Sequence, residues 1–390
     1  MITKRLLLYF FLLLCFLGIS QDAMLSPNAT ISVLTVGTGK ALATKFGHSA
    51  IRLQDDILGI DEVYGYGTYN FEDPNFYWNF VRGKLAYTVT RYSYTSFKQN
   101  YISENRWVNA QVLELSIPQK ETLIRYLETN LLPENRFYTY DFLFENCATK
   151  IPEVLKETLG VALLFDATYL KDPQTFRQLI HQSLATNSWA TFGIDLALGS
   201  VIDIEATTYE HLFLPKYVYE QLKHTTFNNK PLVSKELVLV SKTKEKTVAT
   251  VLSTPLLWLS LFSILVLFIT YIDYTNNKRS YWLDGLLFFT TGTAGIVILF
   301  LWFFTDHVAT KLNYNCLWAF APNLFVTILI VKSKIAPWLK SYIRLALVLL
   351  LLGVVLWLLN IQQFSILLLL VLPVLAVRYI FLLHYFNNKS

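Results

Sequence analysis

The chain has 390 residues, of which 54% are hydrophobic, and its formal net charge is +5. Residues before about 250 mix charged, polar and aromatic types, whereas almost everything from Pro255 onward is apolar. This division excludes a simple soluble protein and predicts an aqueous domain, residues 21–250, followed by a membrane domain, residues 251–390. The small net charge requires no nucleic-acid partner, and we attribute it first to the lysines and arginines that set membrane topology.

The N-terminus has the layout of a secretory signal over residues 1–20. A basic start, MITKR, precedes the apolar run LLLYFFLLLCFLG, and Ser20 offers a cleavage site. An uncleaved anchor is the alternative, and both place the next segment across the membrane. Cys15 belongs to this run, which leaves Cys147 as the only cysteine of the exported domain. An unpaired thiol in a compartment that permits disulfides is a liability unless it is buried or used.

The first part of the exported domain is predicted to be β-structure. HSAIRLQ and EVYGYGTYNF form a hairpin pattern, with Gly59 in the connection. His48 stands at the head of the first strand, where a histidine is usually an ordinary polar residue. Tyr64 and Tyr66 share one face of the second strand because side chains alternate. Depending on register, one of them should neighbour His48 across the hairpin.

Residues 76–107 are dense in aromatic side chains and form either a large aromatic core or an apolar groove. In the groove, cationic side chains would be available to anionic lipid head groups. These side chains are Arg82, Lys84, Arg91 and Arg106. Further along, Pro118 opens a clear amphipathic helix that Pro133 closes. The Lys-rich residues 222–250 are predicted to form a stalk into the membrane.

The stretch YDFLFENCATKIPEVLKETLG holds a candidate nucleophile. Asn146 is a preferred N-cap residue and the helical pattern after it stops at Gly160, so we predict a helix that begins at Asn146. Cys147 would lie in its first turn, where the peptide dipoles favour a thiolate. A buried structural cysteine is the alternative. His181 and His211 follow without metal-ligand spacing, so no metal site and no cofactor are expected.

The membrane half contains apolar blocks that predict about five transmembrane helices, the third block being the shortest. The blocks lie at about 255–273, 282–304, 316–331, 342–360 and 364–383. Basic residues gather in the connections near Lys278 and Lys332, which predicts that these connections face the cytoplasm. The connection 305–315 then lies outside, on the side of the aqueous domain. The chain is therefore expected in the inner membrane, with its soluble domain in the periplasm.

The outer connection, TDHVATKLNYN, concentrates polar residues at the membrane surface. His307 and Asn313 reflect either ordinary interfacial polarity or a second part of the site, acting with Asn146 and Arg106 as substrate-binding groups. Under the second interpretation, His307 or Asn313 lies close enough to Cys147 to touch a shared ligand.

A thiol at a helix N-terminus and a histidine at a strand end are the minimum for nucleophilic thiol catalysis. The imidazole of His48 would remove a proton while Cys147 attacks an acyl carbonyl, and a backbone N–H would bind the oxyanion. His48 precedes Cys147, the reverse of the papain order, as a circular permutation would produce.

Several motifs together resemble the Lnb N-terminal periplasmic domain family: FGHSAIRL, VYGYGTYNF, NFYWNFVRGKLAY, ENRFYTYDFLFENCATKI, WATFGIDLALG and FLP. DHVATKLNYNCLW resembles the membrane part of the same family. The resemblance implies an α+β soluble domain with a permuted papain-like fold, as in NlpC/P60 and lecithin:retinol acyltransferase-like domains, followed by an all-α membrane domain. It matches His48 and Cys147 to the catalytic pair, and the strand of the third polar group offers Tyr64 and Tyr66.

Full-length members of this family include the lipoprotein N-acyltransferase of Bacteroidota, so the resemblance implies a two-step acyl transfer. Cys147 would take an acyl chain from a phospholipid, and the α-amine of a diacylglyceryl-cysteine lipoprotein would attack the thioester while His48 shuttles protons. Two alternatives stay open. One is a membrane-anchored cysteine amidase or peptidase of the cell envelope, and the other is a non-catalytic lipid- or envelope-binding module.

Overall fold

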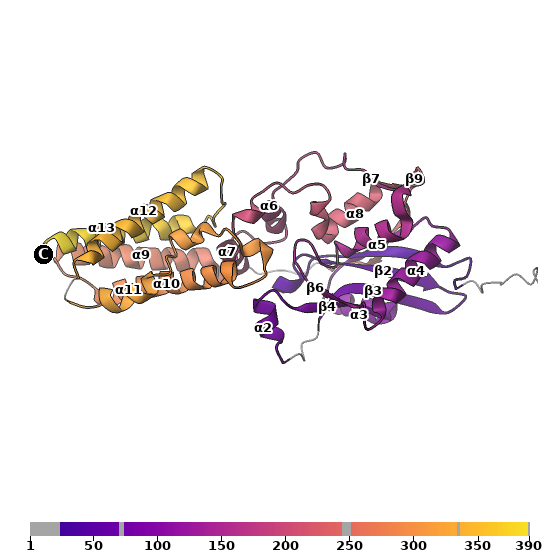
Figure 1. Ribbon diagram of the computed structural model, residues 1–390, viewed down its shortest axis with the longest axis horizontal. Coiled ribbons are helices and arrows are strands. Elements are labelled where there is room, and N and C mark those ends of the chain that lie inside the picture. Colours follow the sequence, from indigo (N-terminus) through magenta and orange to yellow (C-terminus); the bar gives the residue numbers. More distant parts are fainter. Residues whose placement is uncertain (1–23, 70–73, 244–250, 334–335, 389–390) are drawn as a thin grey trace, which may run out of the picture.

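The computed structural model describes residues 24–69, 74–243, 251–333 and 336–388, and its two parts lie end to end (Figure 1). A sheet-rich part comes first and a bundle of long helices follows. This confirms the prediction of an α+β domain followed by a helical membrane region. The expected signal segment, residues 1–20, lies outside the described residues.

In the described part of the chain, a seven-stranded antiparallel sheet has the order β10-β5-β1-β2-β3-β4-β6. Its strands are β1 (Thr30–Val36), β2 (His48–Asp55), β3 (Ile60–Thr68), β4 (Ala86–Ser93), β5 (Val108–Leu113), β6 (Phe137–Thr139) and β10 (Val233–Val240). The predicted β2–β3 hairpin is confirmed, and Gly59 takes a positive φ of +67° in its connection. The predicted stalk is wrong for β10, which pairs with β5 at the sheet edge because its residues have the extended, alternating pattern of a strand.

Helices cover both faces of the sheet. On one face, α4 (Ile117–Leu131) and α5 (Lys150–Leu159) bury their apolar stripes against β1, β2 and β3. On the other face, α3 (Tyr94–Ser103) packs Phe97 against the alternate residues of the same strands. The predicted helix after Pro118 is confirmed, and Ser116 and Gln119 form a capping box at its start.

Shorter elements complete the soluble part. They are α2 (Phe76–Val81), α6 (Phe176–His181), α7 (Trp189–Ala197), α8 (Pro215–Lys223), the small sheet of β7 (Leu163–Phe165), β8 (Thr225–Phe227) and β9 (Lys230–Pro231), and the 3₁₀ turn η3 (Ser200–Ile202). Although α7 belongs to the first half of the sequence, its Phe192 and Leu196 pack on the core of the membrane bundle.

Among the described residues, four helices are long and apolar enough to cross a membrane. They are α9 (Pro255–Thr275), α10 (Tyr281–Phe303), α12 (Trp338–Leu358) and α13 (Leu368–Asn388). The expected fifth span, at 316–331, runs along α10 from the outer connection to Ile330, whose carbonyl oxygen accepts from Arg279 at the other end of the bundle, but it is not one long helix. That block forms the 3₁₀ turn η7 (Tyr314–Leu317) and the 8-residue helix α11 (Asn323–Ile330), which at 1.5 Å per residue reaches only about 12 Å.

Close packing on α10 explains why the third block is not one long helix. A Cβ added at Gly292 would lie 2.1 Å from the backbone nitrogen of Leu324, and one added at Gly295 would lie 2.0 Å from the carbonyl oxygen of Ala319. The first turn of α11 therefore rests on Gly292, and the backbone before it rests on Gly295. Non-helical backbone is tolerated at membrane depth where protein buries it.

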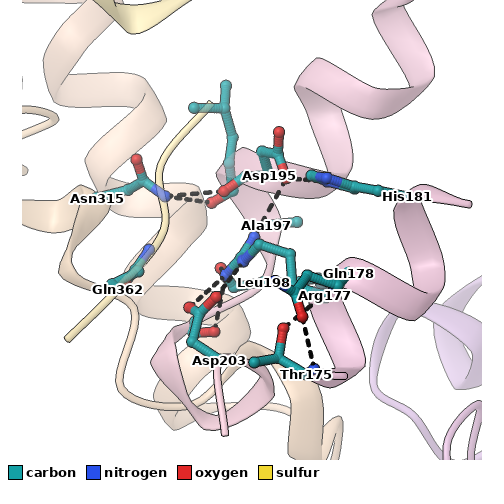
Figure 2. Close-up of polar contacts among 12 residues, drawn as sticks. Thr175, Arg177, Gln178, His181, Asp195, Ala197, Leu198, Asp203, Asn315 and Gln362 are labelled. Atoms are coloured by element: carbon teal, nitrogen blue, oxygen red, sulfur yellow. Dashed lines mark hydrogen bonds and ion pairs between the residues drawn. The ribbon is translucent and has the colours of Figure 1, made fainter. Parts of the chain in front are cut away.

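The soluble part is joined to the outer connection 305–315 by buried hydrogen bonds (Figure 2). Asn313 Nδ2 donates to the carbonyl oxygens of Leu196 and Ala197 at 2.8 and 3.0 Å, and Asn315 Nδ2 donates to that of Asp195 at 3.0 Å. These contacts hold the end of α7 on the bundle. They also place the connection on the side of the soluble part, as predicted.

Arg177 braces the same junction from inside the soluble part (Figure 2). Its guanidinium is buried and pairs with Asp203 at 2.7 Å and with Asp195 at 3.2 Å. His181 Nε2 lies 2.8 Å from the same Asp195 carboxylate. We refer to Arg177, His181, Asp195, Asn313 and Asn315 as the junction cluster.

A second ionic cluster is buried at the opposite end of the bundle. Asp284 accepts from Arg279 Nε and from Arg378 Nε, each at 2.7 Å, and Arg378 Nη1 also donates to Asp273 at 2.8 Å. Arg279 further donates to the carbonyl oxygen of Ile330. The two positive and two negative charges balance while they connect α9, α10, α11 and α13. Charges at such depth are stable only when they are paired in this way.

We predict that Asp284→Asn destabilises the bundle, because it leaves two buried guanidinium groups short of a carboxylate. Breaking a buried pair costs ~3–5 kcal/mol, so thermal unfolding of the detergent-solubilised protein should begin at a clearly lower temperature. Asp306→Asn is the matched control, since that carboxylate is 61% exposed and 3.5 Å from Lys84. Equal unfolding temperatures for the two variants would contradict the prediction.

Candidate active site

A cavity of about 560 Å³ lies in the soluble part, where β2 begins and β3 ends. Its lining combines polar and aromatic side chains from the strands, from α3 and from the loop before β2. The lining residues are Ala43, Thr44, Gly47, His48, Tyr66, Gly67, Thr68, Tyr69, Thr90, Tyr92, Asn100, Tyr101, Glu104 and Arg106. Of the predicted site residues, His48, Tyr66 and Arg106 therefore meet at one cavity.

Cys147 lies at the edge of this cavity. Its Cβ is 3.7 Å from the position that a side chain on Gly67 would occupy, and the backbone N–H of Ser49 forms a hydrogen bond to its sulfur. Ser49 follows His48 directly in β2, so the thiol and the imidazole come from neighbouring positions at one end of the sheet. Cys147 is half-buried, and its thiol is free. This is the pair of groups that thiol catalysis requires.

The turn that carries Cys147 is built by Asn146. Its Oδ1 accepts from the backbone N–H groups of Ala148 and Thr149 at 2.7 and 3.0 Å, and its Nδ2 donates to the carbonyl oxygens of Phe142 and Phe213. Asn146 thus caps the turn that precedes α5, whereas the predicted N-cap position is wrong: α5 begins at Lys150, four residues after Asn146, with Thr149 as its N-cap. The helix ends before Gly160, as predicted. Because its carboxamide is committed to backbone groups, Asn146 positions the nucleophile.

The hairpin register sets Gly67 beside His48. Ala50 pairs with Gly65 and Ile51 with Tyr64, and the same register continued along the strands brings Gly67 opposite His48. A glycine, and not a tyrosine, would then stand directly opposite His48, while Tyr66 lines the same cavity as His48. A glycine at the strand end leaves space there for the Cys147 turn to approach.

The two tyrosines differ in their surroundings. Tyr64 is buried away from the cavity, and its hydroxyl donates to Glu128 at 2.6 Å. Tyr66 lines the cavity, and its hydroxyl accepts from Asn130 at 2.8 Å. Burial raises the pKa of both phenols, so both are neutral at pH 7. Tyr66 is thus the one of the pair that can meet a ligand.

The resting pair is a neutral thiol and a neutral imidazole. Burial, assisted by the charge of Arg106, lowers the pKa of His48 from 6.5 to about 4. Burial raises the pKa of the Cys147 thiol above its ordinary 9.0, although backbone N–H groups and the Arg106 charge oppose that increase. The predicted thiolate in a helix first turn is therefore not what the environment favours. His48 has the protonation state of a general base instead.

Arg106 places an unused donor at this cavity. Its side chain is 3% exposed, its Nε donates to the carbonyl oxygen of Gly37 at 2.7 Å, and its Nη1 donates to Glu104 at 2.8 Å. Its Nη2 is buried and has no hydrogen-bond partner among the described residues. A buried guanidinium nitrogen without a partner is costly, so a ligand oxygen in the cavity would satisfy it.

The two candidates from the outer connection lie elsewhere. His307 Nε2 donates to the carbonyl oxygen of Phe80 at 3.1 Å, which attaches α2 to the membrane part. Asn313 is fully buried in the junction cluster, where its amide donates to α7 and its Oδ1 accepts from Asn315 and Gln362. Neither residue lines the cavity. Both therefore fix the position of the soluble part.

Sequence reasoning did not single out Gly67 or Tyr101. The signal for Gly67 was the pattern GYG at the end of a strand, since glycine there marks a close approach of backbone. Tyr101 lines the cavity and its ring lies 4.8 Å from the Arg106 guanidinium, a proximity that depends on the loop between α3 and β5. Within the described residues, no group of three or more His, Cys, Asp and Glu side chains is arranged to hold a metal ion.

We predict that alkylation of Cys147 by iodoacetamide rises with pH through a midpoint above 9.0, because burial raises the thiol pKa. Arg106→Gln should move this midpoint higher still, since it removes a charge that favours the thiolate. Mass spectrometry of the Cys147 peptide in a Cys316→Ser background gives the measurement. Arg125→Gln, an exposed guanidinium on α4, is the control. A midpoint near pH 7 would restore the thiolate interpretation.

Comparison with known proteins gives two family models that match this chain. The Lnb N-terminal periplasmic domain matches residues 20–182, and the Lnb transmembrane domain matches residues 245–390. The searches of curated proteins and of solved structures returned no match. The two matched ranges contain the cavity, Cys147 and all four apolar spans, and they follow each other in the order that the fold shows. The chain is therefore a member of the Lnb family, a membrane protein with a periplasmic domain.

Proposed function

We propose that this protein is a thiol acyltransferase of the inner membrane. It takes an acyl chain from a phospholipid onto Cys147 and passes it to the α-amine of the N-terminal diacylglyceryl cysteine of a lipoprotein. The observation that carries this proposal is that Cys147 lies beside a cavity that His48 and the unpartnered Nη2 of Arg106 border, in a chain of the Lnb family. Family membership supports a lipoprotein-modifying enzyme in general, and the residues below give the specific chemistry.

In the first step, the sulfur of Cys147 attacks the ester carbonyl of the phospholipid while His48 takes the thiol proton. The lowered pKa of His48, about 4, leaves its imidazole unprotonated at neutral pH, so a ring nitrogen is open to this proton, and it also makes the imidazole a weaker base than an ordinary histidine. The carbonyl oxygen becomes an oxyanion, which the backbone N–H groups beside the sulfur and Arg106 Nη2 can stabilise. Collapse breaks the ester bond, and the leaving lysophospholipid oxygen receives the proton from His48.

In the second step, the lipoprotein amine attacks the Cys147 thioester. His48 removes a proton from the attacking nitrogen and returns it to the departing sulfur, so the thiol is regenerated and an amide is formed. Transfer to the amine rather than to water requires that bound lipid excludes water from the half-buried Cys147. The same chemistry with water as the acceptor would make the protein a cysteine hydrolase, which is the second candidate.

We predict that Cys147→Ser abolishes transfer, because an alcohol is a far weaker nucleophile than a thiol, and that His48→Ala lowers the rate by orders of magnitude. Intact-mass analysis should find an acyl adduct on Cys147 of the wild-type protein when phospholipid is present without lipoprotein. Cys316→Ser and His224→Ala, which alter a thiol and an exposed histidine remote from the cavity lining, are the controls.

Three outcomes separate the candidates. An adduct that persists until a lipoprotein amine is added supports the transferase. An adduct that decays in water at the rate of turnover indicates the hydrolase. Full activity of Cys147→Ser would end the thiol mechanism for both.

Arg106→Gln should lower the rate of Cys147 acylation by about 10²-fold, the usual effect of removing one oxyanion donor. Arg106→Lys keeps the charge but lacks the forked guanidinium that bonds Gly37 and Glu104 at once, so it should recover only part of the rate. Single-turnover formation of the acyl adduct is the measurement. Equal rates for wild type and Arg106→Gln would remove Arg106 from the mechanism.

A further inference from the structure

The helix α2, with the sequence FYWNFV, exposes an unusual set of large side chains. Tyr77 is 78% exposed, Trp78 55% and Phe80 52%, whereas Phe76 is buried. Adjacent aromatic side chains seldom stay in contact with water in a soluble protein unless the surface binds something. We refer to Tyr77, Trp78 and Phe80 as the α2 aromatic face.

The α2 aromatic face lies beside the outer end of the spanning helix α10. The backbone N–H of Asp306 donates to the carbonyl oxygen of Arg82 at 2.8 Å, and His307 Nε2 donates to that of Phe80 at 3.1 Å. Asp306 is only three residues beyond Phe303, where the spanning helix α10 ends. Figure 1 shows α2 on the side of the soluble part that faces the membrane helices.

The close fit at this contact depends on a glycine. Gly83 has a φ of +69°, and a Cβ there would lie 3.0 Å from the backbone nitrogen of His307. The apolar surface continues on the membrane side, because Phe303 and Phe304 are 63% and 70% exposed. The spanning helix α10 ends at these two phenylalanines, so the lipid surface is expected at their level. The α2 aromatic face would then lie at the lipid–water boundary, where Trp and Tyr are enriched in membrane proteins.

The charges near α2 also suit a phospholipid surface. The Arg82 guanidinium lies 5.7 Å from the Trp78 ring centroid, and Lys84 remains 47% exposed beside Asp306. Cations directly above an aromatic belt can contact lipid phosphates while the rings lie among the upper acyl carbons.

A continuous set of rings leads from α2 to the cavity. The Phe76 ring stacks on Phe80 at 6.3 Å and contacts Tyr69 at 5.5 Å, and Tyr69 both contacts Tyr87 at 5.2 Å and lines the cavity. The rings of Phe76 and Tyr69 thus connect the exposed face to the cavity that Cys147 borders. An acyl chain would keep apolar contact along this route.

We propose that the α2 aromatic face is immersed in the outer leaflet of the membrane that the bundle spans, and that it is the entrance through which a phospholipid acyl chain reaches the cavity. The entrance role rests on the proposed function, whereas immersion does not. The occupant is a phospholipid surface, because the face continues the lipid-exposed end of α10.

The test of immersion uses a spin label in the full-length protein. Tyr77→Cys is labelled in a background with Cys15, Cys147 and Cys316 changed to serine, in nanodiscs of phosphatidylethanolamine and phosphatidylglycerol. Power saturation should show greater access of the label to oxygen than to a water-soluble nickel complex, as for Phe303→Cys. Val161→Cys, 99% exposed beside β7 at the end far from the bundle, should show the reverse.

A Tyr77 label as accessible to nickel as the Val161 label would overturn immersion. A label that loses nickel access only when lipoprotein is added would assign the face to a protein partner and would also overturn it. Because the labelled protein has no nucleophile, neither result depends on the proposed reaction.

The entrance role is tested by acylation rates in the protein with Cys147 intact. The double variant Tyr77→Asp/Trp78→Asp should acylate Cys147 at least tenfold more slowly from phospholipid than wild type does. The ratio of this rate to that with a water-soluble short-chain thioester should fall as well, and Val161→Asp should leave the ratio as in wild type. An unchanged ratio in the double variant would refute the entrance. Failure of every variant, wild type included, to acylate would instead refute the proposed function.

Discussion

The arrangement of this protein depends on the buried polar join between α7 and the outer connection of the bundle. The backbone N–H groups of Gly199 and Ser200 donate to the carbonyl oxygens of Ala309 and Leu312, and a Cβ on Gly199 would lie 1.9 Å from the carbonyl oxygen of Lys311. With the amides of the junction cluster, nearly every polar group at this contact has a fixed partner. Each such bond would be costly to leave unmade, so the soluble part has one position on the membrane helices, and the cavity has one height above the bilayer.

At the candidate active site, burial affects the reactivity of Cys147 and His48. Burial raises the pKa of Cys147 and lowers that of His48, which disfavours an ion pair, whereas in the proposed reaction it would keep water from the Cys147 thioester. The charge of Arg106 opposes the first change and supports the second. A neutral thiol next to a ready base can be activated when a substrate arrives, and it stays unreactive until then. This suits a lone thiol in an oxidising compartment.

Inside the membrane, the bundle satisfies its polar groups by two devices. The first turn of α11 and the irregular backbone before it rest on Gly292 and Gly295 of α10, and the charges of Asp284 and Arg378 are paired with further opposite charges. Both devices act on the same helix, α10, which also extends to the connection that contacts α2.

The sequence by itself determined the features that rest on local pattern. These are the division into a soluble and a membrane part, the side of the 305–315 connection, the β2–β3 hairpin and the capping role of Asn146. The candidate pair of His48 and Cys147 also came from the sequence and its family resemblance. Hydrophobic periodicity, turn residues and capping groups act over a few neighbouring residues. The structures that they specify can therefore be predicted from the sequence alone.

Only the tertiary structure decided the rest. The short α11 depends on glycines of α10 some thirty residues earlier, and the edge strand β10 depends on β5. The pKa values of Cys147 and His48 follow from burial, and the unpartnered Nη2 of Arg106 follows from what Gly37 and Glu104 occupy. Desolvation, close packing and the supply of hydrogen-bond partners all depend on contacts between residues that are distant in the chain. A local sequence pattern therefore cannot predict them.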